Sequence, residues 1–231
     1  MTERSDFNWN SGAPNRMARI LYWFGRSSCV VFCHTILRTS VTGRENIPTE
    51  GGFILAPVHR SNLDTPIAAI VTRRCLRYMG KDSIWKSSRV IGWVMSSLGG
   101  FPVARGRSVA DREALKRCQI VLTTGQPLVL FPEGTRQHGP IVQQLFEGPA
   151  YLSMKAQVPI VPMGIGGSER AQAKGMKFVR PTRVRVVIGQ PIPPPPLLDG
   201  KAGRVGMSAT TETLRRDIQT LFDEAQAYLG L

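Results

Sequence analysis

A chain of 231 residues is long enough to bury one substantial core and is too short for two full-sized domains. With 42% hydrophobic and 20% charged residues, it has the composition of a globular protein, which excludes disordered, collagenous and disulfide-scaffold classes. The 30 Lys and Arg against 16 Asp and Glu give a formal net charge of +14, which favours nucleic acid, an anionic membrane or phosphate-bearing molecules as partners.

The cysteines follow none of the CxxC spacings that are typical of zinc or redox sites. Cys29, Cys33 and His34 lie close together in the sequence, but no second cluster completes a metal site. A chain of this size also needs no disulfides. We expect reduced cysteines in a cytosolic compartment, no metal ion and no bound cofactor.

The N-terminal segment lacks the apolar run of a signal peptide, and residues 16–38 are the most apolar stretch of the chain. Polar residues interrupt this stretch, so it is too short to span a bilayer. On a helical wheel one arc is basic and the other side is apolar. The basic residues are Arg16, Arg19, Arg26, His34 and Arg38, and the apolar ones are Met17, Leu21, Phe24, Phe32 and Ile36.

Such an amphipathic, basic segment suits an anionic membrane surface. A helix that packs on the rest of the domain, with its arginines in solvent, is an equally good interpretation, and both can hold at once.

Beyond residue 40, short apolar runs alternate with segments of helical period. Strands are expected at residues 52–58, 76–80, 127–131, 159–165 and 184–188, and helices at 68–74, 83–98, 108–124 and 146–155. A closing helix is indicated by an apolar stripe of Leu214, Ile218, Leu221, Phe222, Ala225 and Leu229. The alternation predicts an α/β fold.

A histidine and an aspartate, His59 and Asp64, follow the first buried strand. Pro66 suits the first turn of a helix, which makes Thr65 the expected N-cap and leaves the Asp64 carboxylate free for another partner. On one continuous helix the two side chains would point about 140° apart, so a loop-to-helix transition must bring them together. A histidine oriented by an aspartate can take a proton from a hydroxyl. Taken alone, the pair is also compatible with a structural histidine.

A second polar segment, Phe131–Arg136 (FPEGTR), stands at the end of the strand expected at 127–131. Its glycine turn lies between an acid and a base, where backbone amides and a guanidinium can hold a phosphate or polar head group. With both motifs, the chain resembles the phospholipid/glycerol acyltransferase family, of the PlsC-like lysophosphatidic acid acyltransferase (1-acylglycerol-3-phosphate O-acyltransferase) type. The other blocks of this resemblance, which covers about residues 40–190, are Gly100–Arg105 (GFPVAR) and Val158–Pro162 (VPIVP).

The resemblance implies a mixed sheet flanked by helices, with an acyltransferase domain at residues 40–231 and an amphipathic membrane-interface segment at residues 1–39. It makes His59 the general base and Asp64 its orienting partner. It assigns the phosphate of the acceptor to Arg105, and a hydrophobic pocket to Pro162. The glycerol phosphate would be bound by the third block, through Glu133, Gly134, Thr135 and Arg136.

The implied reaction is direct transfer of a fatty acyl group from a thioester of coenzyme A or acyl carrier protein. The acceptor is a lysophosphatidate, whose free hydroxyl at sn-2 loses its proton to His59 and attacks the thioester carbonyl to give phosphatidic acid. Ser61 is the nearby nucleophile candidate, but the chain has no GxSxG elbow and the family needs no acyl-enzyme. Val58, Ala104 and Gln137 depart from the family pattern, so glycerol-3-phosphate or another lysophospholipid stays open as the acceptor.

Residues 170–204 contain eight bases and one acid, Asp199. The bases are Arg170, Lys174, Lys177, Arg180, Arg183, Arg185, Lys201 and Arg204. They can serve coenzyme A, the acidic face of acyl carrier protein or anionic lipids, or form a solvated face. We expect a peripheral enzyme on the cytoplasmic face of the cell membrane. A nucleic-acid-binding module is the remote alternative, because no recognition helix or RNA motif accompanies the charge.

Overall fold

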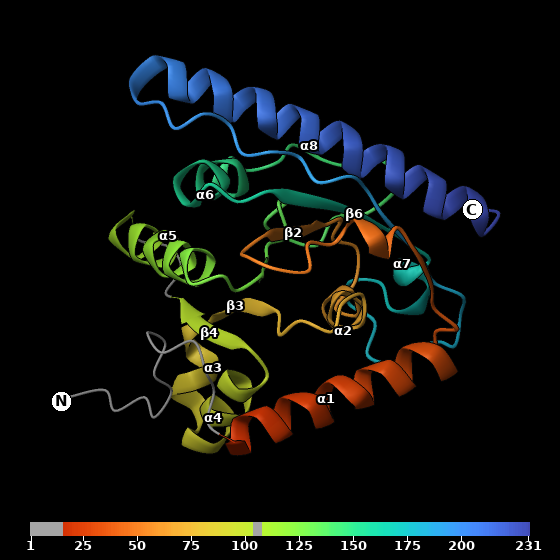
Figure 1. The fold of residues 1–231 in the computed structure, drawn as a ribbon. Helices are drawn as coiled ribbons and strands as arrows, with labels where there is room; N and C mark the ends of the chain where they lie inside the picture. Colours follow the sequence, from red (N-terminus) through yellow and green to blue (C-terminus); the bar gives the residue numbers. More distant parts are fainter. Residues whose placement is uncertain (1–15, 104–107) are drawn as a thin grey trace.

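A seven-stranded sheet forms the centre of the molecule and is flanked by helices (Figure 1). The computed structural model describes residues 16–103 and 108–231. The strands follow one another across the sheet in the order β1-β7-β6-β2-β5-β3-β4, and neighbours run parallel except β6 and β7. The strands are β1 (Ser40–Thr42), β2 (Ile54–Pro57), β3 (Arg77–Lys81), β4 (Gly100–Val103), β5 (Leu128–Val129), β6 (Ile160–Gly166) and β7 (Arg185–Ile188). The predicted α/β fold with a mixed sheet is confirmed.

Helices lie above and below the sheet in Figure 1, with α8 and α6 on one side and α2 and α1 on the other. The helices are α1 (Arg16–Thr35), α2 (Asp64–Ile70), α3 (Asp82–Ser87), α4 (Arg89–Ser97), α5 (Ser108–Thr123), α6 (Gly148–Ala156), α7 (Ser168–Ala171) and α8 (Gly200–Tyr228). The central strands β2 and β6 are buried along their whole length, as expected for strands covered on both faces.

The single helix predicted over residues 83–98 is wrong, because the chain forms two helices, α3 and α4, with an extended Ser88 between them. The break lets α4 fold back onto α3. Trp85 of α3 donates its indole N–H to Ser96 Oγ at 2.9 Å and packs on Gly92, where an added Cβ would lie 3.1 Å from the ring. The short strands β1 and β4 were not predicted, since three or four residues carry no readable period.

The helix α8 lies directly on β6. A Cβ added at Gly164 would come within 2.3 Å of the backbone of Leu221, so only a glycine permits this close approach. The predicted apolar stripe of α8 faces the sheet, with Leu214, Ile218, Phe222 and Ala225 buried and Leu221 and Leu229 partly so.

The N-terminal helix α1 packs on α2 and α4 through Ala18, Tyr22 and Cys33. Arg26 is not a solvated member of a basic face, because its guanidinium donates two hydrogen bonds, of 3.1 and 2.8 Å, to the carbonyl of Thr72. The helix is thus docked on the domain, as one of the two interpretations expected, but that interpretation was wrong to place Arg26 in solvent.

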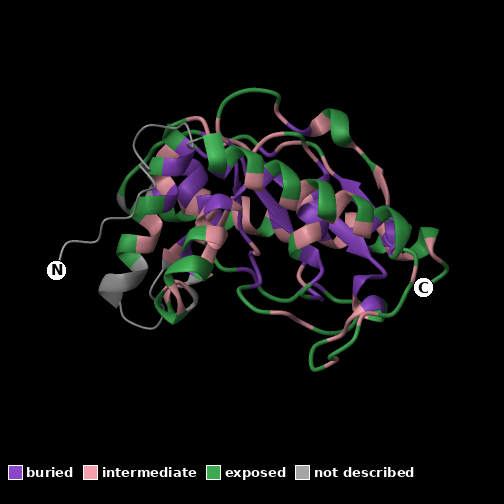
Figure 2. Ribbon diagram, turned by 90° about the horizontal axis from the view of Figure 1, so that it is seen from below, coloured by how far each residue is buried: buried purple, intermediate pink, exposed green. Residues whose placement is uncertain are grey.

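The opposite side of α1 stays in solvent, as the view from below shows (Figure 2). It carries apolar side chains, and the most exposed of them are Met17, Ile20, Phe24 and Val31. None of the helices in the described residues is long and apolar enough to cross a membrane.

Candidate active site

The His59–Asp64 pair forms where β2 ends and α2 begins. His59 Nδ1 lies 3.0 Å from Asp64 Oδ2, and the carboxylate is fully buried. The same oxygen accepts the backbone N–H groups of Arg60 and Ser61, each at 2.7 Å. These bonds tie the loop to the helix start, so α2 begins at Asp64 and the expected N-cap at Thr65 is wrong.

The imidazole of His59 is held on one face by Phe131, whose ring stacks on it at a centroid distance of 3.9 Å and an interplanar angle of 23°. Its side chain is 16% exposed. No described residue forms a hydrogen bond with Nε2. In the tautomer that donates Nδ1–H to Asp64, Nε2 carries the lone pair that a general base needs.

The side chain of Glu133, which was predicted as a substrate ligand, points into the protein interior. Its carboxylate is buried and accepts the guanidinium Nη1 of Arg60 at 2.9 and 2.8 Å, together with the backbone N–H of His59 at 3.0 Å and of Gln143 at 3.1 Å. Both oxygens are thus occupied by protein donors. These contacts give Glu133 a structural role behind the His59 loop.

Arg60, the partner of Glu133, is fully buried and was not predicted as a site residue. Its Nη1 also donates to the His59 carbonyl at 3.1 Å, while Nε and Nη2 donate to the carbonyls of Gly139 at 3.1 Å and Ile141 at 3.0 Å. The guanidinium lies 5.1 Å from the ring centroid of Phe222 in α8. No sequence signal pointed to this role, because Arg60 stands among the polar residues His59, Ser61 and Asn62.

The rest of the third block turns outward beside the histidine. Gly134 adopts a left-handed backbone with φ of 72°, and Thr135 next to it is exposed. Gln137 N–H then donates to the His59 carbonyl at 2.9 Å, which brings the stretch containing Thr135 and Arg136 next to the His59 loop. Arg136 is partly exposed, and no described residue forms a hydrogen bond or ion pair with its guanidinium.

Two further site residues were predicted, Arg105 and Pro162. Arg105 falls outside the described residues. Pro162 is buried within β6, in register with Ala56 of β2.

Ser61 is not available as a nucleophile in this arrangement. It is fully buried, its hydroxyl donates to the carbonyl of Gln172 at 2.7 Å, and the same oxygen accepts the N–H of Leu63 at 3.1 Å. The described residues contain no group of three His, Cys, Asp or Glu side chains that could hold a metal ion.

The sequence profile of the Acyltransferase family matches residues 38–166. This stretch is more than half of the chain and contains the His59–Asp64 pair and the segment Phe131–Arg136.

Several curated relatives are 1-acyl-sn-glycerol-3-phosphate acyltransferases. The chloroplastic enzyme BAT2 of Brassica napus is 29% identical over 157 residues, which are 67% of this chain and 45% of that protein. The enzyme of Bacillus subtilis is 24% identical over 153 residues, which are 66% of this chain and 72% of that protein. The chain thus spans less than half the length of the plant relatives that it matches.

A solved structure has the same fold. The 1-acyl-sn-glycerophosphate acyltransferase PlsC of Thermotoga maritima superposes with a TM-score of 0.66 at 25% sequence identity, over 88% of this chain and 79% of that chain.

Proposed function

The chain belongs to the acyltransferase family, and we propose that it transfers a fatty acyl group from a thioester to the free hydroxyl of 1-acylglycerol-3-phosphate. The observation that carries the proposal is the 3.0 Å contact between His59 and a buried Asp64. The names of the curated relatives support the acceptor. The hydroxyl at sn-2, and coenzyme A or acyl carrier protein as the donor, belong to the same proposal.

In the proposed reaction, His59 Nε2 accepts the proton of the acceptor hydroxyl. Asp64 stabilises the imidazolium that forms and keeps the ring in the reactive tautomer. The hydroxyl oxygen attacks the thioester carbonyl, and the thiolate leaves with the proton that His59 returns. Since Ser61 already donates to the Gln172 carbonyl, no acyl-serine step is part of the proposal.

We assign the phosphate of the acceptor to the exposed part of the third block. The guanidinium of Arg136 can bind a phosphate, and Thr135 and the backbone of Gly134 precede it in the chain. Arg105 is proposed as a further phosphate ligand, and Pro162 as part of the hydrophobic pocket, on the resemblance alone.

Glu133 and Arg60 are positioning residues in this proposal. The buried pair joins the backbone of His59 to Gln143 and to the carbonyls of Gly139 and Ile141, so it fixes the third block against the catalytic loop.

We also propose that the protein works at a membrane surface without crossing it, on the cytoplasmic face. The apolar side of α1 points away from the domain, and the adjoining α4 exposes Val90, Ile91 and Trp93. Because a lipid acceptor stays in the leaflet, the enzyme has to bind it at the membrane surface.

The test is thiol release from palmitoyl-CoA by wild type, His59→Ala and Asp64→Asn, with lysophosphatidate, glycerol-3-phosphate, lysophosphatidylcholine or no acceptor. Release that depends on lysophosphatidate and falls about 10²- to 10⁴-fold in His59→Ala is expected, because that is the typical contribution of a general base. His34→Ala, which removes an exposed histidine from α1, is the matched control and should keep full activity.

Thiol release with another acceptor would change the assigned acceptor and leave the proposed mechanism unchanged. Release without any acceptor would indicate a thioesterase, and an active His59→Ala would overturn the assigned base. Each arm is repeated with palmitoyl acyl carrier protein as the donor, and inactivity with both donors would reject the function.

A further inference from the structure

A loop of defined shape, residues 172–180, follows the short helix α7. Its ends are joined by a hydrogen bond of 2.8 Å from the N–H of Arg180 to the carbonyl of Ala171. A tight turn at its tip has Met176 N–H donating to the Ala173 carbonyl at 3.1 Å, with Gly175 at φ of 93°. These bonds hold the loop in a fixed conformation.

The root of this loop is tied to the catalytic segment. Ser61 Oγ donates to the Gln172 carbonyl at 2.7 Å, and Ser61 N–H donates to the Asp64 carboxylate at 2.7 Å. Two short hydrogen bonds therefore connect the loop to Asp64, the partner of His59.

The loop presents an exposed aromatic ring in a stretch of sequence that is rich in cations. Phe178 is 81% exposed, while the next residue, Val179, packs on the core, so the chain turns the larger side chain outward. The cations of the loop and its flanks are all exposed, and none forms an ion pair with a described residue. They are Arg170, Lys174, Lys177, Arg180 and Arg183.

Acids are nearly absent here. Residues 170–198 contain none, and the nearest one before them, Glu169, has its carboxylate 3.2 Å from His138 Nδ1. An exposed phenylalanine within a cluster of bases matches the interface of an anionic bilayer, where the ring enters the acyl boundary and the cations stay among the head groups. Each base near such a surface contributes about 1 kcal/mol of attraction.

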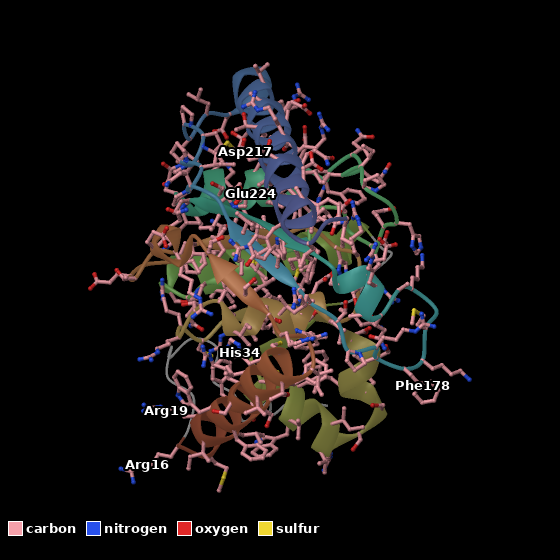
Figure 3. The ribbon with its side chains drawn as sticks, turned by 90° about the vertical axis from the view of Figure 1, so that its right-hand side faces the viewer. Arg16, Arg19, His34, Phe178, Asp217 and Glu224 are labelled. Atoms are coloured by element: carbon pink, nitrogen blue, oxygen red, sulfur yellow. The ribbon has the colours of Figure 1, made fainter. Side chains whose placement is uncertain are left out.

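The position of the loop in the molecule fits the same partner. In Figure 3, Phe178 points outward in the half of the molecule that also holds α1 with Arg16 and Arg19, whereas Asp217 and Glu224 lie on α8 at the other end. A bilayer that contacts α1 can therefore be reached by the loop while the acids of α8 face away from it.

We propose that residues 172–180 are a second membrane-contact site, in which the Phe178 ring inserts among anionic lipids and the surrounding cations bind their head groups. The proposal rests on the proposed function, because it takes the enzyme to meet its acceptor in a bilayer. With α1 as the first contact, the loop sets the height and tilt of His59 above the head-group layer.

The first experiment is sedimentation with vesicles of phosphatidylcholine alone and of phosphatidylcholine mixed equally with phosphatidylglycerol. Phe178→Ala should lower binding to the anionic vesicles about tenfold, which corresponds to burial of most of one phenylalanine ring. The double change Lys174→Gln with Lys177→Gln should lower it by a similar factor and reduce its salt dependence. Leu197→Ala changes another exposed apolar residue, in the connector before α8; it is the matched control and should bind as wild type.

The second experiment separates membrane contact from a role inside the site. Phe178→Ala should raise KM for lysophosphatidate presented in anionic vesicles about tenfold. It should leave kcat and KM unchanged for a short-chain lysophosphatidate that stays monomeric in water. Equal losses with both substrates would overturn the proposal, since they would place Phe178 in the substrate site.

Three further outcomes decide the rest. If Phe24→Ala in α1 weakens vesicle binding and Phe178→Ala does not, the loop proposal fails while the membrane attachment stands. If the lysine changes weaken binding to acyl carrier protein and not to vesicles, the surface serves the donor and the proposal fails. If wild type binds no vesicles but acylates the monomeric acceptor, the membrane contacts fail and the chemistry stands.

Discussion

Arg60 and Glu133 bring opposite charges into the interior directly behind the catalytic histidine. Neither touches the position where a substrate would react, yet between them they hold the backbone of His59, Gln143, Gly139 and Ile141. A buried charge pair of this kind is tolerated only because nearly every donor and acceptor is satisfied. The pair therefore fixes the third block, because moving Glu133 away from His59 would leave the Arg60 guanidinium without its partner.

Glu133→Gln should therefore lower the free energy of unfolding by about 3–5 kcal/mol, because it leaves the Arg60 guanidinium buried without a counter-charge. Urea denaturation measures this effect. Glu212→Gln is the control, since Glu212 pairs with Arg215 on the surface of α8, and it should not change the midpoint. Equal midpoints for the two variants would contradict the assigned role of the buried pair.

At the scale of elements, the contact between β6 and α8 connects the core to the site. Gly164 lets the helix lie on the strand, and Phe222 of the same helix covers the Arg60 guanidinium. The long C-terminal helix thus closes the hydrophobic core and shields the buried ion pair from water.

Gly164→Ala should destabilise the protein by about 1–3 kcal/mol, because the new methyl group would meet the backbone of Leu221 and push α8 off the sheet. Gly148→Ala is the matched control. An added Cβ at Gly148, in the first turn of α6, meets nothing within 4 Å, so this change should be neutral or slightly stabilising. Thermal denaturation of both variants checks the prediction, and an unchanged melting temperature for Gly164→Ala would contradict the close contact.

Packing of α1 and α5 buries the thiols of Cys33 and Cys118. The free energy of unfolding should therefore depend on pH in the alkaline range. Burial raises the pKa of Cys33 to about 12, with a further contribution from nearby Cys29, and burial raises the pKa of Cys118 to about 12. Up to the ordinary value of 9.0 both states keep these protons. Above it the unfolded chain loses them first, so stability should fall as pH rises from about 9 toward 12.

Urea denaturation across that range, on wild type and on Cys33→Ala with Cys118→Ala, measures the effect. The double variant should show a flatter decline. A decline of the same slope would mean that other groups govern the alkaline behaviour.

At the scale of the whole molecule, the net charge of +14 is unevenly placed. The loop 172–180 and its flanks carry unpaired bases, while α8, at the other end, combines the acids Asp217 and Glu224 with the bases Arg215 and Arg216 (Figure 3). A charge distribution of this kind orients a peripheral protein before any apolar side chain inserts.

Binding to anionic vesicles should therefore fall steeply between about 0.1 M and 1 M salt, where the screening length decreases from about 10 Å to about 3 Å. Binding to neutral phosphatidylcholine vesicles, which depends on the apolar side of α1, should change little over the same range. Salt-independent binding to anionic vesicles would show that the charge asymmetry plays no part in attachment.

The amino-acid sequence by itself determined much of this protein. The apolar runs predicted β2, β3, β5, β6 and β7, because strands that are covered on both faces leave mostly hydrophobic segments. The His-x4-Asp spacing with a helix-starting proline predicted that His59 and Asp64 would meet, because a local loop-to-helix turn is enough to join them. The FPEGTR segment and an N-terminal helix were likewise readable from local pattern, which left docking of that helix and contact with a membrane equally open.

Tertiary structure alone decided how the site is held together. The contacts of Glu133 with Arg60, of Ser61 with Gln172 and of Phe222 with the Arg60 guanidinium join residues 73 to 162 positions apart. No local period encodes such pairs, since which charge is buried depends on what the sheet and α8 bring around it. For the same reason, a predicted substrate ligand, Glu133, proved to face the interior.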